Sequence, residues 1–148
     1  MQLETFKTLA PRGWHHHDKC DAVLFDALRH VALNEPFDIE RANQKGKWLR
    51  RPLEYGDCGA TTSRDMLIGI MIYLNHFKRS SLIIELYDYM IRNKFKMGDE
   101  FEPPNTRVWA TPNIAFTLCK LKNKLTGSRN LFGYLPIGPY STSLGYPS

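Results

Sequence analysis

The sequence has few cysteines, and their arrangement argues against two kinds of small stabilised domain. There are three, Cys20, Cys58 and Cys119, which is an odd number at wide spacing without a Cys-x-x-Cys pair. This pattern indicates neither a disulfide framework nor a zinc ribbon. We therefore expect three reduced thiols that serve as small buried hydrophobic side chains, in a protein made in a reducing cytoplasm.

Long hydrophobic runs are also lacking. The longest apolar stretch, residues 66–74, is much shorter than the roughly 20 residues that a membrane-spanning helix requires. The N-terminal residues MQLETFKTLAPRGW do not show the basic-then-apolar order of a secretory signal. The sequence thus predicts neither membrane insertion nor signal-dependent export. Release inside a virion after cell lysis remains compatible with this pattern.

No strong excess of one charge is present either. The formal net charge is +5 and the pI is about 9.2, which favours an anionic partner only mildly. With 43% hydrophobic and 24% charged residues, the composition is that of a globular protein. A length of 148 residues fits one domain with one core.

Apolar residues recur at helical spacing in four stretches, so a mainly α fold is predicted. The expected helices cover about residues 18–33, 63–74, 81–93 and 111–126. Asp18, Thr62 or Ser63, and Thr111 are the expected caps, and a further short helix is expected near residues 39–43. Long loops separate several of these elements, and Gly98 is expected to end the third helix in a left-handed conformation.

The second and third predicted helices differ in the distribution of their apolar residues. Residues 66–74 are apolar around most of the helix, which predicts a central, buried helix. Residues 81–93 carry a single apolar stripe, which predicts a peripheral one. Because only a few residues connect them, the two should form an antiparallel inner and outer helical hairpin.

The C-terminal residues differ in composition from the rest of the chain. Residues 131–148 contain no charged side chain and are rich in Gly, Pro, Ser, Thr and Tyr. Such a segment is unsuited to a regular helix and to isolation in water. We therefore predict a helical domain over residues 1–127 and an extended tail over residues 128–148, with residues 131–148 bound to another chain in a homo- or hetero-oligomer.

The stretch GATTSRDMLIGIMIYL, residues 59–74, carries a resemblance to a known group of enzymes. Ser63-Arg64-Asp65 at the start of an apolar helix resembles the inner-helix starts of the helical-toroid sugar enzymes, the six-hairpin glycosidases and related lyases. The similarity in helix order spans about residues 12–125. The resemblance implies a sugar cleft in which Asp65 is an acid/base or sugar-contacting carboxylate and Arg64 is its partner or binds an acidic sugar.

Further site residues follow if this resemblance holds. Glycoside hydrolysis uses a second carboxylate about 5–9.5 Å from the first, and Asp18, Asp21 and Asp57 are the candidates because each lies at or before a helix start. Stacking platforms for the sugar would come from the aromatic residues Trp14, Trp48 and Trp109.

Two observations weaken this enzymatic interpretation. Six helical pairs of about 40 residues need about 240 residues, and this chain has room for about half of them. In addition, an acidic residue such as Asp65 in a first helical turn stabilises a helix by about 0.3–1 kcal/mol without any catalytic role.

Two other clusters suggest binding chemistry. His15, His16 and His17 precede Asp18, but no second ligand cluster follows, so no metal site and no cofactor are predicted. In KGKWLRR, residues 45–51, basic side chains surround Trp48 and offer a surface for nucleic acid or an acidic glycan. Acidic residues nearby on both sides make nucleic acid the less favoured partner.

Three functions therefore stand in order. The first is a structural or assembly protein, such as a component of a phage particle, with a helical body and a partner-clasping C-terminal arm. The second is a carbohydrate-active, toroid-like protein with carboxylates at helix N-termini. The third is a binder of nucleic acid or another acidic polymer through the Trp48 loop.

Overall fold

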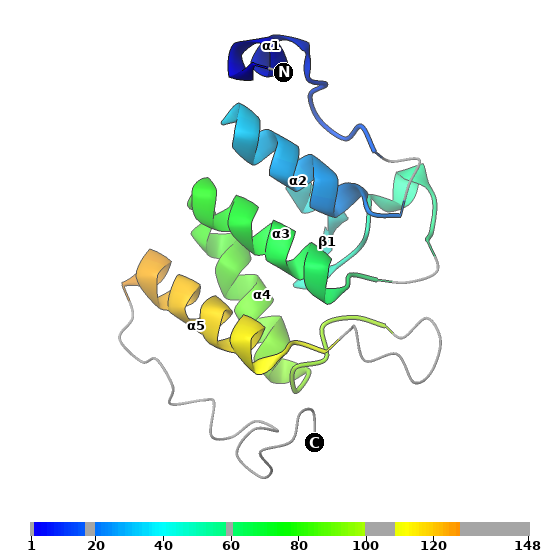
Figure 1. The fold of residues 1–148 in the computed structure, drawn as a ribbon. Helices are drawn as coiled ribbons and strands as arrows, with labels where there is room; N and C mark the ends of the chain where they lie inside the picture. The colour runs from blue at the N-terminus through cyan, green and yellow to red at the C-terminus, as the bar shows by residue number, and fades with distance from the viewer. Residues whose placement is uncertain (1, 17–19, 59–60, 100–108, 128–148) are drawn as a thin grey trace.

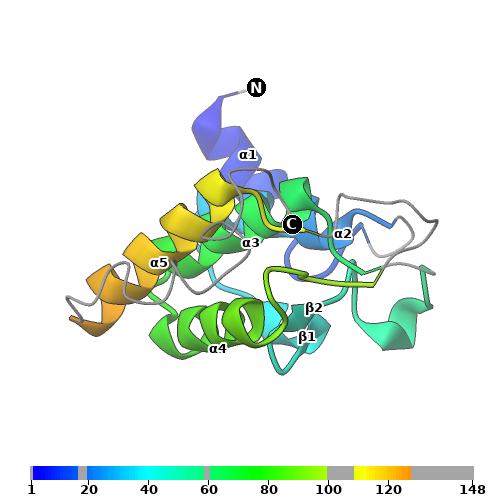
Figure 2. The same cartoon turned by 90° about the horizontal axis from the view of Figure 1, so that it is seen from below.

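The chain forms two layers, seen in a computed structural model that describes residues 2–16, 20–58, 61–99 and 109–127. One layer holds three helices side by side, α2 (Ala22–Leu33), α3 (Arg64–His76) and α5 (Pro112–Thr126). The other holds α4 (Ser80–Arg92) and a hairpin of β1 (Asn43–Gln44) and β2 (Lys47–Trp48) (Figures 1 and 2). The expected mainly α fold is confirmed.

Three of the expected helices have the boundaries that local sequence signals indicate. In α5 the Thr111 side chain accepts a hydrogen bond from the Ile114 N–H at 3.2 Å, Pro112 occupies the first turn, and Gly127 ends the helix with φ 74°. Ser63 precedes α3, although its side chain makes no capping hydrogen bond. The short helix η1 (Ile39–Ala42) also lies where it was expected.

Other elements were not anticipated. Helix α1 (Leu3–Leu9) has no buried residue, and a single 3-10 turn, η2 (Leu53–Tyr55), follows the hairpin. Helix α2 begins at Ala22, so it starts later than expected; Asp18, the expected cap, lies outside the described residues. The predicted C-terminal tail, residues 128–148, also lies outside them.

Helix α3 lies in the middle of its layer and packs closely on α2. A Cβ on Gly69 would lie 2.6 Å from Cδ1 of Leu24, so the absence of a side chain lets the two helices approach. On its other sides α3 contacts α4 and α5. Helices α2, α3 and α5 run in the same direction, whereas α4 runs antiparallel to α3, which confirms the predicted hairpin (Figure 1).

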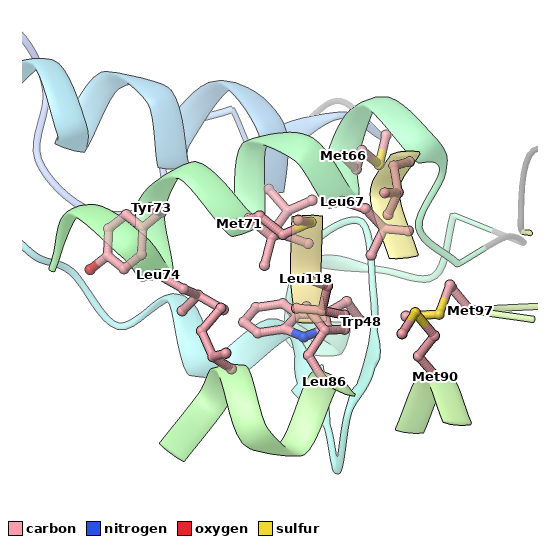
Figure 3. Close-up of a cluster of buried hydrophobic side chains, with 14 of the residues drawn as sticks. Trp48, Met66, Leu67, Met71, Tyr73, Leu74, Leu86, Met90, Met97 and Leu118 are labelled. Atoms are coloured by element: carbon pink, nitrogen blue, oxygen red, sulfur yellow. The ribbon is translucent and has the colours of Figure 1, made fainter. Parts of the chain in front are cut away.

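Trp48 is the largest side chain of the core and comes from the short strand β2. It is fully buried, and Figure 3 shows its indole ring among leucines from three helices, Leu74, Leu86 and Leu118. The hairpin is held against α4 at Gly46, where a Cβ would lie 2.7 Å from the carbonyl oxygen of Glu85. The hairpin thus closes the core between the two layers.

The end of α4 differs from the expectation for Gly98. Lys94 and Phe95 adopt the left-handed conformation, with φ 54° and 72°, and the Phe95 N–H donates to Met90 O at 2.8 Å. Gly98 does not have a positive φ; it is buried, and a Cβ there would lie 3.0 Å from the Cβ of Thr61. The glycine therefore permits close packing, and the helix ends without its help.

Candidate functional site: an apolar face of the helical layer

The predicted carboxylates lie toward the end of the layer where α2 and α3 begin. Asp21 is the N-terminal flanking residue of α2, and its Oδ1 is buried without a hydrogen-bond partner among the described residues. Asp65 is exposed in the first turn of α3, and Asp57 is exposed in the loop after η2. The structure therefore places Asp21 and Asp65 at the starts of neighbouring parallel helices.

A disulfide between Cys20 and Cys58 joins this corner, with the two Cα atoms 5.7 Å apart. The expectation of three reduced, buried thiols was therefore wrong for Cys20 and Cys58. Cys119 is a free thiol and is buried, as expected. The spacing of 38 residues gives no local signal, because the chain must fold before the two sulfur atoms meet. The bond also brings Asp21 and Asp57, the sequence neighbours of the two cysteines, to one place.

A hollow beside the disulfide is too small for a sugar. It measures about 10 Å³ and is lined by Leu49, Arg50, Arg51, Leu53, Gly56, Asp57 and Cys58. That volume holds about one water molecule, whereas ligand pockets usually measure about 300–1,000 Å³. The carboxylates thus lie near one another without a described cleft between them.

The tryptophans do not form stacking platforms at this corner. Trp14 is 8% exposed, packs edge-on against Phe37 and donates its indole N–H to Asp38 O at 3.1 Å. Trp48 is in the core, and Trp109 is half-buried with its carbonyl oxygen accepting from Arg64 Nε at 3.0 Å. Arg64 therefore ties the start of α3 to the chain before α5, a structural contact.

The basic side chains around Trp48 are largely bonded to the protein itself. Arg50 donates to Thr61 O at 2.8 Å and to Cys20 O at 3.2 Å, which links the hairpin to both helix starts. Arg51 donates to Gly56 O at 3.0 Å, and Lys47 pairs with Asp99 at 2.5 Å. With Trp48 buried, this loop has no exposed indole on which a base could stack.

A buried charged cluster holds the loop before α2 to the body. Asp26 is fully buried and pairs with Arg29 Nη1 and His16 Nδ1, each at 2.6 Å. Arg29 also donates to Pro11 O at 2.8 Å and to Gly13 O at 2.5 Å. The Asp26–Arg29 pair lies within α2, and the bonds to Pro11, Gly13 and His16 join the helix to residues 11–16, so the cluster fixes the loop. His16 was expected only as a member of the histidine run.

No group of three or more His, Cys, Asp or Glu side chains in the described part of the chain is arranged to hold a metal ion. His15 and His16 are in ring contact, but His17 and Asp18 lie outside the described residues. Within the same ranges, no helix is sufficiently long and apolar to cross a membrane.

The outer face of the layer, which we define by Phe25, Leu28, Ile68, Ile72 and Phe116, is unusually apolar. These five side chains are 38–46% exposed and come from α2, α3 and α5. Their positions along each helix lie opposite the residues that face α4 and the hairpin. The expectation that α3 is buried on nearly every face was therefore wrong at Ile68 and Ile72. Exposed apolar surface of this kind often marks a site of protein interaction.

A groove runs between α3 and α5 on this outer face and has a volume of about 330 Å³. Its lining contains no charged residue and consists of Ile68, Met71, Ile72, Asn75, Asn113, Ile114, Thr117 and Leu121. The volume lies at the lower end of the range for ligand pockets. The apolar run 66–74 was the sequence signal for the α3 side of this groove, because Ile68 and Ile72 fall within that run.

Comparisons with known proteins gave no relative from which a function could be transferred. No protein-family model matches the chain, and no curated protein and no solved structure matches it. The resemblance to helical-toroid sugar enzymes therefore stays a prediction.

Proposed function

We propose that this protein is a structural or assembly component that acts by binding other protein chains. The observation that carries the proposal is the outer face, where Ile68 and Ile72 are 46% and 43% exposed in the middle of the layer. Full burial of an apolar side chain of this size contributes about 1.5–3 kcal/mol, and a partner that covers the exposed 46% of Ile68 and 43% of Ile72 gains a little under half of that for each. The described residues that line the groove between α3 and α5 include no Cys, His, Asp, Glu, Lys or Arg side chain.

The sequence beyond α5 supports the same proposal. Residues 131–148, which we call the arm, contain eight large apolar or aromatic side chains and no charged one. Such a segment gains free energy when it is buried against a second surface. The chain therefore carries two apolar surfaces, the outer face and the arm, and both become buried when copies of a subunit associate.

Measuring the solution mass by light scattering tests this function. We expect the full chain to form oligomers and a chain that ends at Gly127 to have a lower mass per assembly. Circular dichroism must show that the shortened chain keeps its helices, because its described core lies before residue 128. An equal mass per assembly with and without the arm would reject the proposed function.

A further inference from the structure

We propose that the groove between α3 and α5 is the acceptor site for the arm of a second copy of this chain. The inference rests on the proposed function and adds the surface that receives the arm and the identity of the partner. Each copy would then offer one groove and one arm, so two copies can exchange arms in a closed pair.

We choose the arm as the occupant because both the groove lining and the arm lack charged residues. The chain has 35 charged residues out of 148, yet none lines the groove and none occurs in the arm. A charged peptide side chain would lose hydration among Ile68, Ile72 and Leu121, which is costly, and the cation at the Asn75 end of the groove, Lys124, already bonds to Asn75 Oδ1 at 3.4 Å. An uncharged segment with three Tyr and three Leu loses little and covers Ile68 and Ile72.

The groove also has polar groups that suit the backbone of an extended peptide. Asn75 and Asn113 belong to its lining, on α3 and α5 respectively, and Asn113 is exposed. The Asn75 Oδ1 already accepts from Lys124 at 3.4 Å, so the Asn75 NH2 group and the Asn113 amide are the groups that can bond to peptide groups. Three prolines in the arm favour such an extended form because proline prevents a continuous helix.

The length of the arm is sufficient to reach a neighbouring body. The groove residues on α5 run from Asn113 to Leu121, about 12 Å along the helix. Eighteen extended residues span up to about 60 Å, several times the length of the groove. The part of the arm outside the acceptor groove can therefore cross from one copy to the other.

Full-length variants separate binding between copies from binding within one chain. Ile72→Lys places a charge in the groove, and the double change Leu135→Asp and Ile137→Asp places charges in the arm. Leu53→Lys is the matched control, since Leu53 is 54% exposed on η2 and does not line the groove. Mass is measured over a dilution series, and thermal unfolding checks that each variant folds.

We expect the groove variant and the arm variant to dissociate at least tenfold more readily than the unmodified chain and the control. An equal mixture of the two variants should form a heterodimer, because one intact arm can still enter one intact groove. If mixing restores no association, the arm of one copy does not enter the groove of the other, and the inference is wrong.

Other outcomes distinguish this inference from the proposed function. If the arm variant dissociates while the groove variant keeps its mass, the arm binds elsewhere; the inference is then wrong and the assembly function stands. If both variants and the shortened chain keep the mass of the unmodified chain, both proposals are wrong. A monomeric unmodified chain overturns the inference directly.

Discussion

Ile70 and Ile72 are two residues apart on α3, yet Ile70 is fully buried and Ile72 is 43% exposed. The same contrast holds for the two faces of the whole layer. Its inner face is covered by α4 and the hairpin (Figure 2), whereas the five apolar side chains that define the outer face are each 38–46% exposed. The comparison shows that an apolar sequence identifies side chains for which burial is favourable. It does not identify the surface that covers them.

Removing the buried charge of Asp26 in α2 should change the free energy of unfolding the most. It tests whether the covered side of the layer depends on polar bonds as well as on packing. Asp26→Asn leaves Arg29 buried without its carboxylate, which should lower the free energy of unfolding by about 3–5 kcal/mol. Urea unfolding measures this loss. Asp88→Asn, an exposed change on α4, is the control. A loss below about 1 kcal/mol would contradict the structural role of the cluster.

The pair Ile70→Ala and Ile72→Ala tests the two faces directly. Ile70→Ala creates a cavity and should lower the free energy of unfolding by about 2–5 kcal/mol. At Ile72 the same change should cost the folded monomer less than about 1 kcal/mol. Denaturant unfolding at a concentration that keeps both proteins monomeric compares them. Equal losses would show that Ile72 is covered within its own chain.

The disulfide joins the chain just before α2 to the loop leading to α3, so its removal tests how far this corner stabilises both faces. Changing Cys20 and Cys58 to alanine should lower the free energy of unfolding by about 2–4 kcal/mol, because the unfolded chain gains freedom over 38 residues. Thermal unfolding with and without reductant measures this effect. An unmodified chain whose stability does not respond to reductant would count against the bond.

Tyr73 tests a polar bond on the covered side of α3. Its hydroxyl accepts from the Phe37 N–H at 2.9 Å and donates to Phe37 O at 3.1 Å. Tyr73→Phe leaves both backbone groups without this partner and should cost about 1–3 kcal/mol at neutral pH. Urea unfolding measures the loss, and Phe116→Leu on the open face is the control.

The pH dependence of Tyr73 follows from its burial. Loss of hydration raises the pKa of the Tyr73 hydroxyl in the folded protein. The contribution of this group is therefore fully present below the unfolded tyrosine pKa of about 10 and is lost as the pH rises above it. In Tyr73→Phe the unfolding free energy should fall less between pH 9 and about 11 than in the unmodified chain. An identical slope would contradict this assignment.

Asp65→Asn should have the smallest effect and separates helix stabilisation from sugar chemistry. If Asp65 only interacts with the positive end of α3, the change should cost no more than about 1 kcal/mol. Binding to acidic and neutral oligosaccharides is measured in parallel with thermal unfolding. Sugar binding by the unmodified chain that disappears in the variant, with stability unchanged, would favour the carbohydrate interpretation over the assembly function.

The bounds of helix α5 could be predicted from the sequence, whereas the burial of Trp48 could not. Thr111, Pro112 and Gly127 act through bonds and dihedral angles within a few residues, so the bounds of α5 follow from local chemistry. Trp48 was expected as an exposed stacking ring because basic residues flank it. Its burial depends on Leu74, Leu86 and Leu118, which lie far away in the chain.

The sequence by itself determined the helical content, the antiparallel pair α3 and α4, and the end of α5, because helix periodicity and capping are short-range properties. Tertiary structure decided that Cys20 meets Cys58, that Asp26 is buried with Arg29, and that Ile68 and Ile72 lie on an open face. Those outcomes depend on which segments pack together. The physical reason is that burial and long-range pairing each require contact between two segments that are distant in the chain. A local stretch of sequence describes only one of the two segments.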